Sequence, residues 1–181
     1  MRVSILVTSY NHEAYIGQCL DSALGQTYPN TEVIVIDDGS RDGSMNIVRR
    51  YADRLEAIIE KTNGGQASAY NRSFELRTGD IVMWLDSDDY LYPDVVERIV
   101  AAWGPNVSKV QFRLDMVDAQ SRPLGRQLPR DLHGGPIAAR LMREFGAYGS
   151  PPSSGNAYAR AMLQRLLPVA EGPWRIGADS I

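Results

Sequence analysis

The amino-acid sequence predicts an α/β protein built on a Rossmann-like, mostly parallel sheet flanked by helices. Three observations lead to this prediction. Short apolar runs of strand length alternate with segments of helical periodicity through the first 105 residues. The runs are apolar throughout, which is typical of parallel strands that helices cover on both faces. The chain has 181 residues, 44% of them hydrophobic and 23% charged, which is ordinary for one globular domain.

Each element follows from a local pattern. The predicted strands are the apolar runs at residues 3–9, 31–38, 55–60 and 80–85. The first connecting helix is expected to be capped by Asn11 and to end near Gln26. A second helix is expected around residue 48 and a third at 66–76. A fourth, at 93–103, opens with a proline, as helices often do.

The second half is less regular and carries most of the prolines. We place a soft boundary near residue 105, so that residues 1–105 and 106–181 are two halves of one domain. The expected elements of the second half are a hairpin strand at 108–118 with a turn at 119–125, a loop at 126–136, a helix at 137–145, a short strand at Ala157 and Tyr158, and a helix from about Arg160.

Charge and cysteine content exclude some classes of function. The net charge of −3 argues against a nucleic-acid or anionic-membrane surface, which needs clustered Lys and Arg. The single cysteine, Cys19, forms no disulfide framework and fits a reducing, cytoplasmic location. Its spacing from Ile16 and Leu20 places it on the buried face of a helix. No apolar run approaches the roughly 20 residues of a membrane span.

Polar side chains end three of the predicted strands, at the edge where parallel α/β sheets bind ligands. They are Thr8 on the first strand, Asp37 and Asp38 on the second, and Asp86, Asp88 and Asp89 on the fourth. Neighbouring carboxylates raise one another's pKa unless a cation lies between them. Oxygen ligands select Mg²⁺ or Mn²⁺, which take further ligands from phosphates. The pattern predicts a metal and a phosphorylated ligand. The alternative is that these acids cap the next helix, a role expected for Asp89.

Three ordered segments resemble family 2 glycosyltransferases, which have the A-type glycosyltransferase fold. They are "VSILVTSYNHEAYIGQCLDSALGQTYPNTEVIVIDDGSRDGS", "NGGQASAYNRSF" and "DIVMWLDSDDYLYP". The resemblance is dense over residues 3–103, whereas a lone D-x-D triplet would be weak. It implies a metal-dependent, inverting transfer from a nucleoside-diphosphate sugar to a hydroxyl of a glycan, lipid-linked or other acceptor. It further implies Mn²⁺ or Mg²⁺ as cofactor, a UDP-sugar by family frequency alone, and a role in cell-envelope polysaccharide synthesis.

The resemblance implies nucleotide contacts at Thr8, Tyr10, Asp38 and Gly65. Thr8 and Tyr10 would lie against the base, and Asp38 would accept its ring N–H. Such an acceptor suits uracil, thymine or guanine and not adenine. Gly65 would lie at the diphosphate, where a helix begins. The alternatives are a packed aromatic at Tyr10, an Asx-turn at Asp38 and a tight turn at the glycines. For Asp37 the turn is favoured.

The D-x-D motif implies the metal site. Asp88 would bind the metal directly, and Asp86 would contact the ribose or a metal-bound water. The chain departs from many relatives at Tyr70, where they carry a basic residue. Arg72 follows two residues later, directly after Asn71. Each step along a helix turns the side chain by roughly 100°, so Arg72 does not point in the direction of the expected basic residue. Arg72 is therefore assigned no phosphate role.

The segment "PWRIGADSI" resembles the part of the family that ends in the catalytic carboxylate. Asp179 matches the general base that takes the proton from the acceptor hydroxyl, and its alternative is a helix cap. The predicted sugar and acceptor side comprises Ser154, Gly155, Asn156 and Trp174, although a turn would serve the first three as well. Because family members continue past this carboxylate, the resemblance implies a fragment.

The two histidines are expected to have no role in the site. His12 is interpreted as a solvated residue at a helix start and His133 as a surface residue of a Gly-rich loop. A non-catalytic nucleotide-sugar-binding module, or an inactive fragment, is the alternative function. A nucleotidyltransferase is disfavoured, because the first strand ends in "TSYN" and not in a Gly-rich basic loop.

Overall fold

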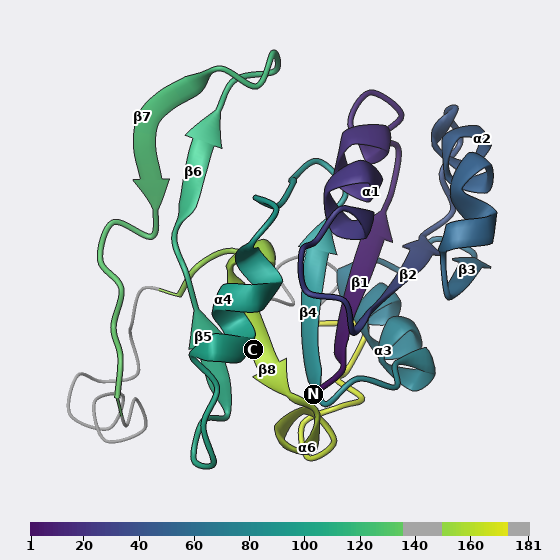
Figure 1. The fold of residues 1–181 in the computed structure, drawn as a ribbon. Coiled ribbons are helices and arrows are strands. Elements are labelled where there is room, and N and C mark those ends of the chain that lie inside the picture. Colours follow the sequence, from purple (N-terminus) through teal and green to yellow (C-terminus); the bar gives the residue numbers. More distant parts are fainter. Residues whose placement is uncertain (136–149, 174–181) are drawn as a thin grey trace.

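The structure, a computed structural model, describes residues 1–135 and 150–173. Its centre is a six-stranded sheet in the order β3-β2-β1-β4-β8-β5 (Figure 1). The strands are β1 (Val3–Ser9), β2 (Thr31–Asp37), β3 (Ala57–Glu60), β4 (Ile81–Asp86), β5 (Lys109–Gln111) and β8 (Asn156–Ala159). β1 to β4 run parallel, while β8 is antiparallel to both β4 and β5. The predicted α/β class with a mostly parallel sheet is confirmed.

Helices cover both faces of this sheet. One layer holds α1 (Ile16–Leu24), α2 (Ser44–Val48) and α4 (Val95–Ala101), and the other holds α3 (Gln66–Leu76) and α6 (Arg160–Leu163). A 3₁₀ helix, η1 (Arg49–Arg54), continues α2. Successive strand residues point to opposite faces, so Ile5 packs in the first layer and Leu6 in the second. Burial on both sides explains why the runs are apolar throughout. Cys19 is buried in the first layer, as predicted.

The predicted cap at Asn11 is wrong. Helix α1 begins only at Ile16, after Tyr15, and no side chain caps it. Asn11 instead adopts a left-handed backbone with φ of 56°, a conformation that asparagine tolerates. Its Oδ1 accepts the N–H of Arg41 at 2.8 Å, which joins the loop after β1 to the loop after β2.

The predicted strand at 108–118 is two strands. Lys109–Gln111 forms β5 at the edge of the main sheet, and β6 (Leu114–Val117) pairs with β7 (Pro123–Leu128) in a separate hairpin. The start of the expected loop at 126–136 therefore belongs to β7. Figure 1 shows the hairpin rising beyond the carboxyl ends of β1 and β4. The short strand and helix expected near residues 157 and 160 are present as β8 and α6, whereas the helix expected at 137–145 lies outside the described residues.

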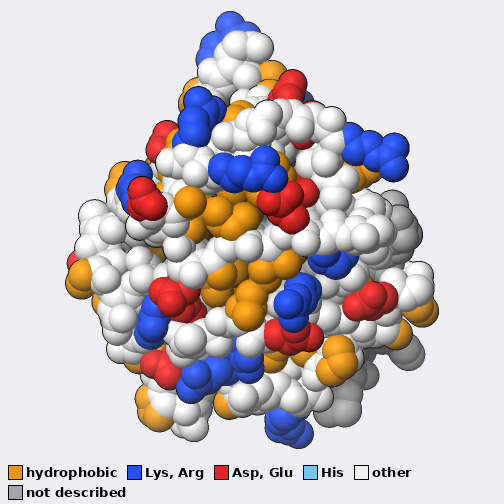
Figure 2. Space-filling view, turned by 90° about the vertical axis from the view of Figure 1, so that its right-hand side faces the viewer, with side chains coloured by type: hydrophobic (Ala, Val, Ile, Leu, Met, Phe, Trp, Pro, Cys, Tyr) orange, Lys and Arg blue, Asp and Glu red, His pale blue; other side chains and the backbone are white. Residues whose placement is uncertain are grey.

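The opposite edge of the sheet is β3, whose residues Ala57–Ile59 are half-buried. Figure 2 faces this side and shows hydrophobic side chains surrounded by charges of both signs. Arg49 and Glu60 form one such pair, with Nη2 and Oε1 2.7 Å apart. Charged side chains of this kind keep an edge strand from pairing with another chain. No helix in residues 1–135 and 150–173 is long and apolar enough to cross a membrane.

Candidate functional site

A cleft of about 570 Å³ lies at the carboxyl ends of β1, β2 and β4. It is lined by Thr8, Ser9, Tyr10, His12, Asp38, Asn63, Gly65, Gln66, Ala69, Asp86 and Asp88. The six residues expected to contact nucleotide or metal are all among them. Parallel strands end at one edge of a sheet, so residues nearly 80 positions apart in sequence meet here.

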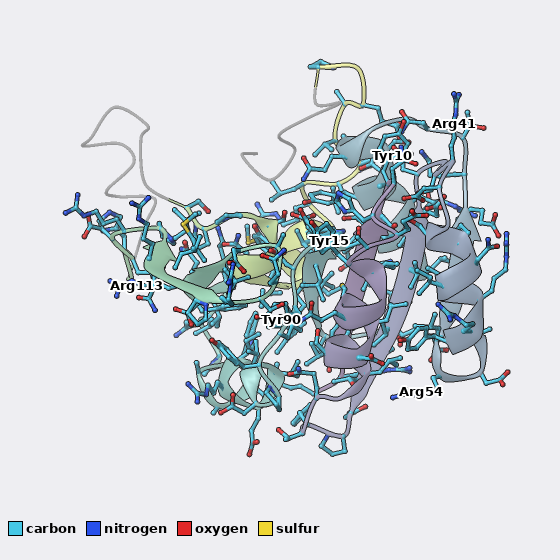
Figure 3. All side chains as sticks on the ribbon, turned by 90° about the horizontal axis from the view of Figure 1, so that it is seen from above. Tyr10, Tyr15, Arg41, Arg54, Tyr90 and Arg113 are labelled. Carbon is cyan, nitrogen blue, oxygen red and sulfur yellow. The ribbon has the colours of Figure 1, made fainter. Side chains whose placement is uncertain are left out.

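Tyr10 is the exposed aromatic of this cleft. It follows directly after β1, and 46% of its surface is accessible. The next residue, Asn11, has a left-handed backbone conformation, and its N–H donates to Ser40 Oγ at 2.8 Å. In Figure 3, which looks onto this edge, Tyr10 lies on the same side as Arg41, with Arg113 at the far end of the view. An exposed ring of this kind is free to stack on a ligand.

Asp37 and Asp38 have different partners. The Asp37 carboxylate accepts the N–H groups of Gly39 (3.1 Å) and Ser40 (2.8 Å), so the turn predicted for this residue is present. The Asp38 carboxylate instead accepts the N–H groups of Gly64 (2.9 Å) and Gly65 (2.7 Å). Asp38 is therefore not part of an Asx-turn of its own, and it fastens the loop after β3 to the end of β2.

Gly65 directly precedes helix α3, at its N-cap position, with φ of 87°, in the left-handed region that favours glycine. Its backbone lines the cleft beside Gln66, the first residue of the helix. The N–H groups at a helix start attract anions such as phosphate. Gly65 therefore lies at the cleft, but the N–H groups of Gly64 and Gly65 both donate to Asp38, and the diphosphate contact stays a prediction.

Position 70 faces the core in this chain. The Tyr70 ring is buried and stacks on Trp84 with 4.6 Å between ring centroids. Arg72 is exposed and pairs with Glu75 on the same helix, away from the cleft. Among the described residues that line the cleft there is no Lys or Arg. The described residues that line the cleft therefore offer no basic side chain to a diphosphate.

The three acids after β4 have different surroundings. The pKa of Asp86 is raised to about 6, mainly by burial and also by the neighbouring Asp89 and Asp88, while hydrogen bonds from Ser153 and Thr8 act in the opposite direction. Ser153 Oγ donates to Asp86 Oδ2 at 2.5 Å, and Thr8 Oγ1 donates to Oδ1 at 3.2 Å. Burial also raises the pKa of Asp89. Asp88 is the open member, with 51% of its side chain accessible.

The helix cap expected for Asp89 is wrong. Helix α4 begins at Val95 after Asp94, five residues beyond Asp89. The Asp89 N–H donates to the Asp86 carbonyl at 2.9 Å, which closes a turn directly after β4. This turn keeps all three carboxylates at the strand end, as a binding site requires.

The acids suit a divalent metal whose remaining coordination positions are filled by water and a bound ligand. In residues 1–135 and 150–173 no three acidic, His or Cys side chains gather as a closed metal site. Mg²⁺ and similar ions often use only one or two carboxylates, together with water and substrate phosphates. Asp88 is exposed at the cleft, and Asp86 lies beside it with a raised pKa that a nearby cation would offset. These two residues would hold the metal.

His12 is one of the cleft residues that the sequence interpretation missed, together with Ser9, Asn63, Gln66 and Ala69. It lines the cleft, with Nδ1 2.8 Å from Ser87 Oγ and 4.0 Å from Asp88 Oδ1. The helix start was expected at this residue, but the helix begins four residues later, so His12 belongs to the strand-end loop. Its place directly after "SYN" was the only signal. His133 is half-buried and does not line this cleft.

Three of the predicted sugar-side residues, Ser154, Gly155 and Asn156, lie in η2 (Ser153–Gly155) and at the start of β8, and all three are buried. Ser154 Oγ accepts the Asp86 N–H at 3.1 Å. The Asn156 amide donates to the carbonyls of Pro151 and Pro152. The turn alternative describes these contacts, and a contact with sugar stays a prediction. Trp174 and Asp179 lie outside the described residues.

Comparison with known proteins bears on this site. The family model described as glycosyl transferase family 2 matches residues 4–166. An uncharacterized glycosyltransferase of Nostoc sp. is 32% identical over 190 aligned residues, which cover 99% of this chain and 57% of the relative. The chain therefore spans little more than half the length of that relative.

Solved structures share the fold. The mannosyltransferase PcManGT from Pyrobaculum calidifontis, in complex with GDP-Man and Mn²⁺, has a TM-score of 0.70 and is 28% identical. That likeness covers 99% of this chain and 49% of the other. TarS of S. aureus has a TM-score of 0.52 and 34% identity, over 56% of this chain and 19% of TarS.

Proposed function

This chain belongs to glycosyl transferase family 2, and on that premise we propose that it transfers a sugar from a nucleoside-diphosphate sugar to an acceptor hydroxyl, with a divalent metal and with inversion. One observation carries the proposal. A single cleft brings together an exposed aromatic ring, a carboxylate with acceptor capacity, and a pair of acids of which Asp88 is exposed, from the ends of three strands. These groups suit the base, its ring N–H and a metal-bound diphosphate, respectively.

The base contacts fall to Tyr10 and Asp38. The exposed Tyr10 ring offers a stacking surface, and Asp38 offers a carboxylate acceptor. Uracil, thymine and guanine present a ring N–H to such an acceptor, whereas adenine does not. We favour UDP, as the most frequent donor nucleotide of the family, and GDP is the second candidate. The 28% identical mannosyltransferase, solved with GDP-Man, supports keeping guanine.

The diphosphate depends on the metal in this proposal. The described cleft residues include no Lys or Arg, so the charge of two phosphates needs another partner. A bound Mn²⁺ or Mg²⁺ would supply that positive charge and stabilise the departing nucleoside diphosphate. Asp88 would bind the metal directly, and Asp86 would act on the ribose or a metal-bound water. The Mn²⁺ of the mannosyltransferase complex supports the same choice of ion.

The transfer is a single displacement. Asp179, which lies outside the described residues, is the proposed base that accepts the proton of the acceptor hydroxyl. The acceptor oxygen forms its bond to the anomeric carbon as the bond from that carbon to the diphosphate breaks, which inverts the centre. No protein nucleophile is needed for one such step. A glycan or lipid-linked acceptor of the cell envelope is the substrate class we propose.

A binding and turnover experiment tests this function. UDP, GDP and ADP are titrated into the protein by calorimetry, with Mn²⁺ and with EDTA. We expect UDP or GDP to bind more tightly than ADP, and only with the metal. Release of nucleoside diphosphate from UDP- and GDP-sugars is then followed with and without candidate acceptors. Binding without transfer by the full natural protein would favour a non-catalytic nucleotide-sugar-binding module, and equal affinity for all three nucleotides would contradict the proposal.

A further inference from the structure

Lys61 is a cation that reaches the floor of the proposed base site. It follows directly after β3, and its Nζ lies 2.5 Å from Asp38 Oδ1. Both side chains are largely buried, with 19% of Lys61 and 7% of Asp38 accessible. Lys61 Nζ also donates to the Thr62 carbonyl at 2.9 Å, which fixes the ammonium in place. Sequence motifs gave no reason to single out this residue.

The partners of Asp38 leave one acceptor position. Its Oδ1 accepts from Lys61 and from the Gly64 N–H, while Oδ2 accepts only from the Gly65 N–H. A carboxylate can accept about four hydrogen bonds. One position on Oδ2 is therefore without a donor among the described residues. Asp38 lines the cleft, so a ligand bound there is the candidate donor for that position.

Lys61 supplies the charge that this arrangement needs. A carboxylate removed from water is costly unless it is paired and hydrogen-bonded. The two glycine N–H groups orient the Asp38 carboxylate, but only Lys61 provides an opposite charge within 4 Å in the described structure. Lys61 is not one of the lining residues, so it acts on a ligand through Asp38.

We propose that Lys61 is a positioning residue for base selection, because it compensates the charge of the Asp38 carboxylate and fixes the orientation in which Oδ2 accepts a ring N–H. The inference rests on the proposed nucleotide-sugar function and adds a residue to it. The ligand remains a base with a ring N–H, which uracil, thymine and guanine have. Neutral cytosine and adenine have an unprotonated ring nitrogen at this edge and would face the carboxylate with a lone pair.

The test uses nucleotides that differ only at the N–H. Binding of UDP and of N3-methyl-UDP, and of GDP and of N1-methyl-GDP, is measured by calorimetry with Mn²⁺. In the unaltered protein we expect the better parent diphosphate to bind about 10- to 100-fold more tightly than its methylated form, as for a hydrogen bond to a charged group. Lys61→Met should remove most of this preference, and Lys61→Arg should keep it. Arg49→Met is the matched control, since it removes an exposed cation paired with Glu60, beside Lys61.

Each outcome decides the inference. A folded Lys61→Met protein that keeps the preference would overturn it, as would an equal loss of affinity for parent and methylated nucleotides, which would mean that Lys61 only supports the loop. If thermal melting shows that Lys61→Met is unfolded, Lys61→Gln replaces it, and a reduced preference is again expected. If the unaltered protein binds no nucleoside diphosphate, the proposed function fails, which is a different result from a normal preference that ignores Lys61.

Discussion

Asp88 differs from the two acids beside it in its access to water. Its side chain is half exposed at the cleft, whereas burial raises the pKa of both Asp86 and Asp89. A metal that keeps its waters and binds phosphates needs a ligand with this kind of access. Asp86, held by Thr8 and Ser153, is a fixed wall of the site. The single residue best placed to bind the metal is therefore Asp88.

Asp88→Asn should remove the metal dependence of nucleotide binding. The amide keeps the size of the side chain but loses the charge that attracts the cation. We expect the affinity for UDP or GDP with Mn²⁺ to fall by at least about tenfold, or 1.4 kcal/mol, to the level seen with EDTA. Calorimetry with and without metal measures this. Asp94→Asn, at an exposed acid paired with Arg98, should leave the dependence unchanged. Metal-dependent binding that survives in Asp88→Asn would assign the metal to other residues.

Tyr70 shows how one substitution can change the role of a position. The ring packs between α3 and β4 on Trp84, and its hydroxyl accepts from Gln66 Nε2 at 3.0 Å. A basic side chain at this position would bury a charge and lose the stacked ring. At this position, where the resemblance implied a basic residue, the chain makes an aromatic core contact.

Tyr70→Lys should therefore destabilise the protein without strengthening nucleotide binding. We expect the free energy of unfolding to fall by about 3–5 kcal/mol, as for the loss of a buried aromatic side chain. Tyr70→Phe keeps the ring and should cost only about 1 kcal/mol, for the lost hydrogen bond. Urea unfolding curves measure both changes. A Tyr70→Lys protein of normal stability with tighter diphosphate binding would show that position 70 can face the cleft.

At the scale of elements, a buried carboxylate fastens the amino end of the sheet. Glu32 on β2 accepts hydrogen bonds from Ser4 Oγ on β1, from Thr78, and from the Gly79 N–H at 3.0 Å, and it pairs with Arg2. Burial acts to raise the pKa of Glu32, but the hydrogen bonds from Ser4, Thr78 and Gly79 together lower it below the usual value. This network joins β1, β2 and the turn before β4 at the end opposite the cleft.

The lowered pKa of Glu32 predicts a loss of stability in acid. Its contribution is complete above the pKa in the unfolded chain, about 4.3, and is lost as the pH falls through the lower pKa of the folded state. Glu32→Gln should lower the free energy of unfolding at pH 7 by about 1–3 kcal/mol. The NH₂ group of glutamine is itself a donor and would face O–H and N–H donors that now bond to the carboxylate. The stability of the Glu32→Gln variant should then change less than that of the unaltered protein between pH 5 and pH 3, a range that brackets the unfolded-state pKa of about 4.3.

Chemical denaturation over this range compares the two proteins. Glu56→Gln is the matched control, because Glu56 is an exposed partner of the same Arg2 and should matter little. Parallel pH profiles for Glu32→Gln and the unaltered protein would show that another group accounts for the acid sensitivity.

The elements of the first half could be predicted because each depends on local patterns. The apolar runs at 3–9 and 31–38 become β1 and β2 almost residue for residue, and the helix at 66–76 is α3. The errors arise where contacts between distant loops decide. Asn11 bonds to the loop after β2 and not to its own helix. Lys61 and His12 contact residues just after other strands, 23 and 75 positions away in sequence, and one sequence does not reveal these contacts.

At the scale of the whole molecule, the two halves of the chain share one sheet. β8 and β5 come from beyond residue 105, yet they extend the sheet next to β4. The segment before β8 carries Ser153 and Ser154, which bond to Asp86 and so help to shape the acid cluster. The antiparallel pairing of β8 and β5 was not predictable, because short runs such as Asn156–Ala159 carry no signal for their partner. The site therefore depends on the second half even where the first half supplies its side chains.

We predict that a substitution of Asp179 affects catalysis and not the binding of the donor nucleotide. If Asp179 acts on the acceptor hydroxyl, Asp179→Asn should leave the affinity for donor nucleotide nearly unchanged and lower turnover by roughly 10²–10⁴-fold, the range of a positioned acid–base group. Asp88→Asn should instead weaken donor binding and turnover together. Calorimetry and a transfer assay on the full natural protein measure the two effects, since this chain spans 57% of the Nostoc relative. A normal transfer rate in Asp179→Asn would move the base to another carboxylate, with Asp89 as the next candidate, since it lies beside the metal-binding acids and its pKa is already raised by burial.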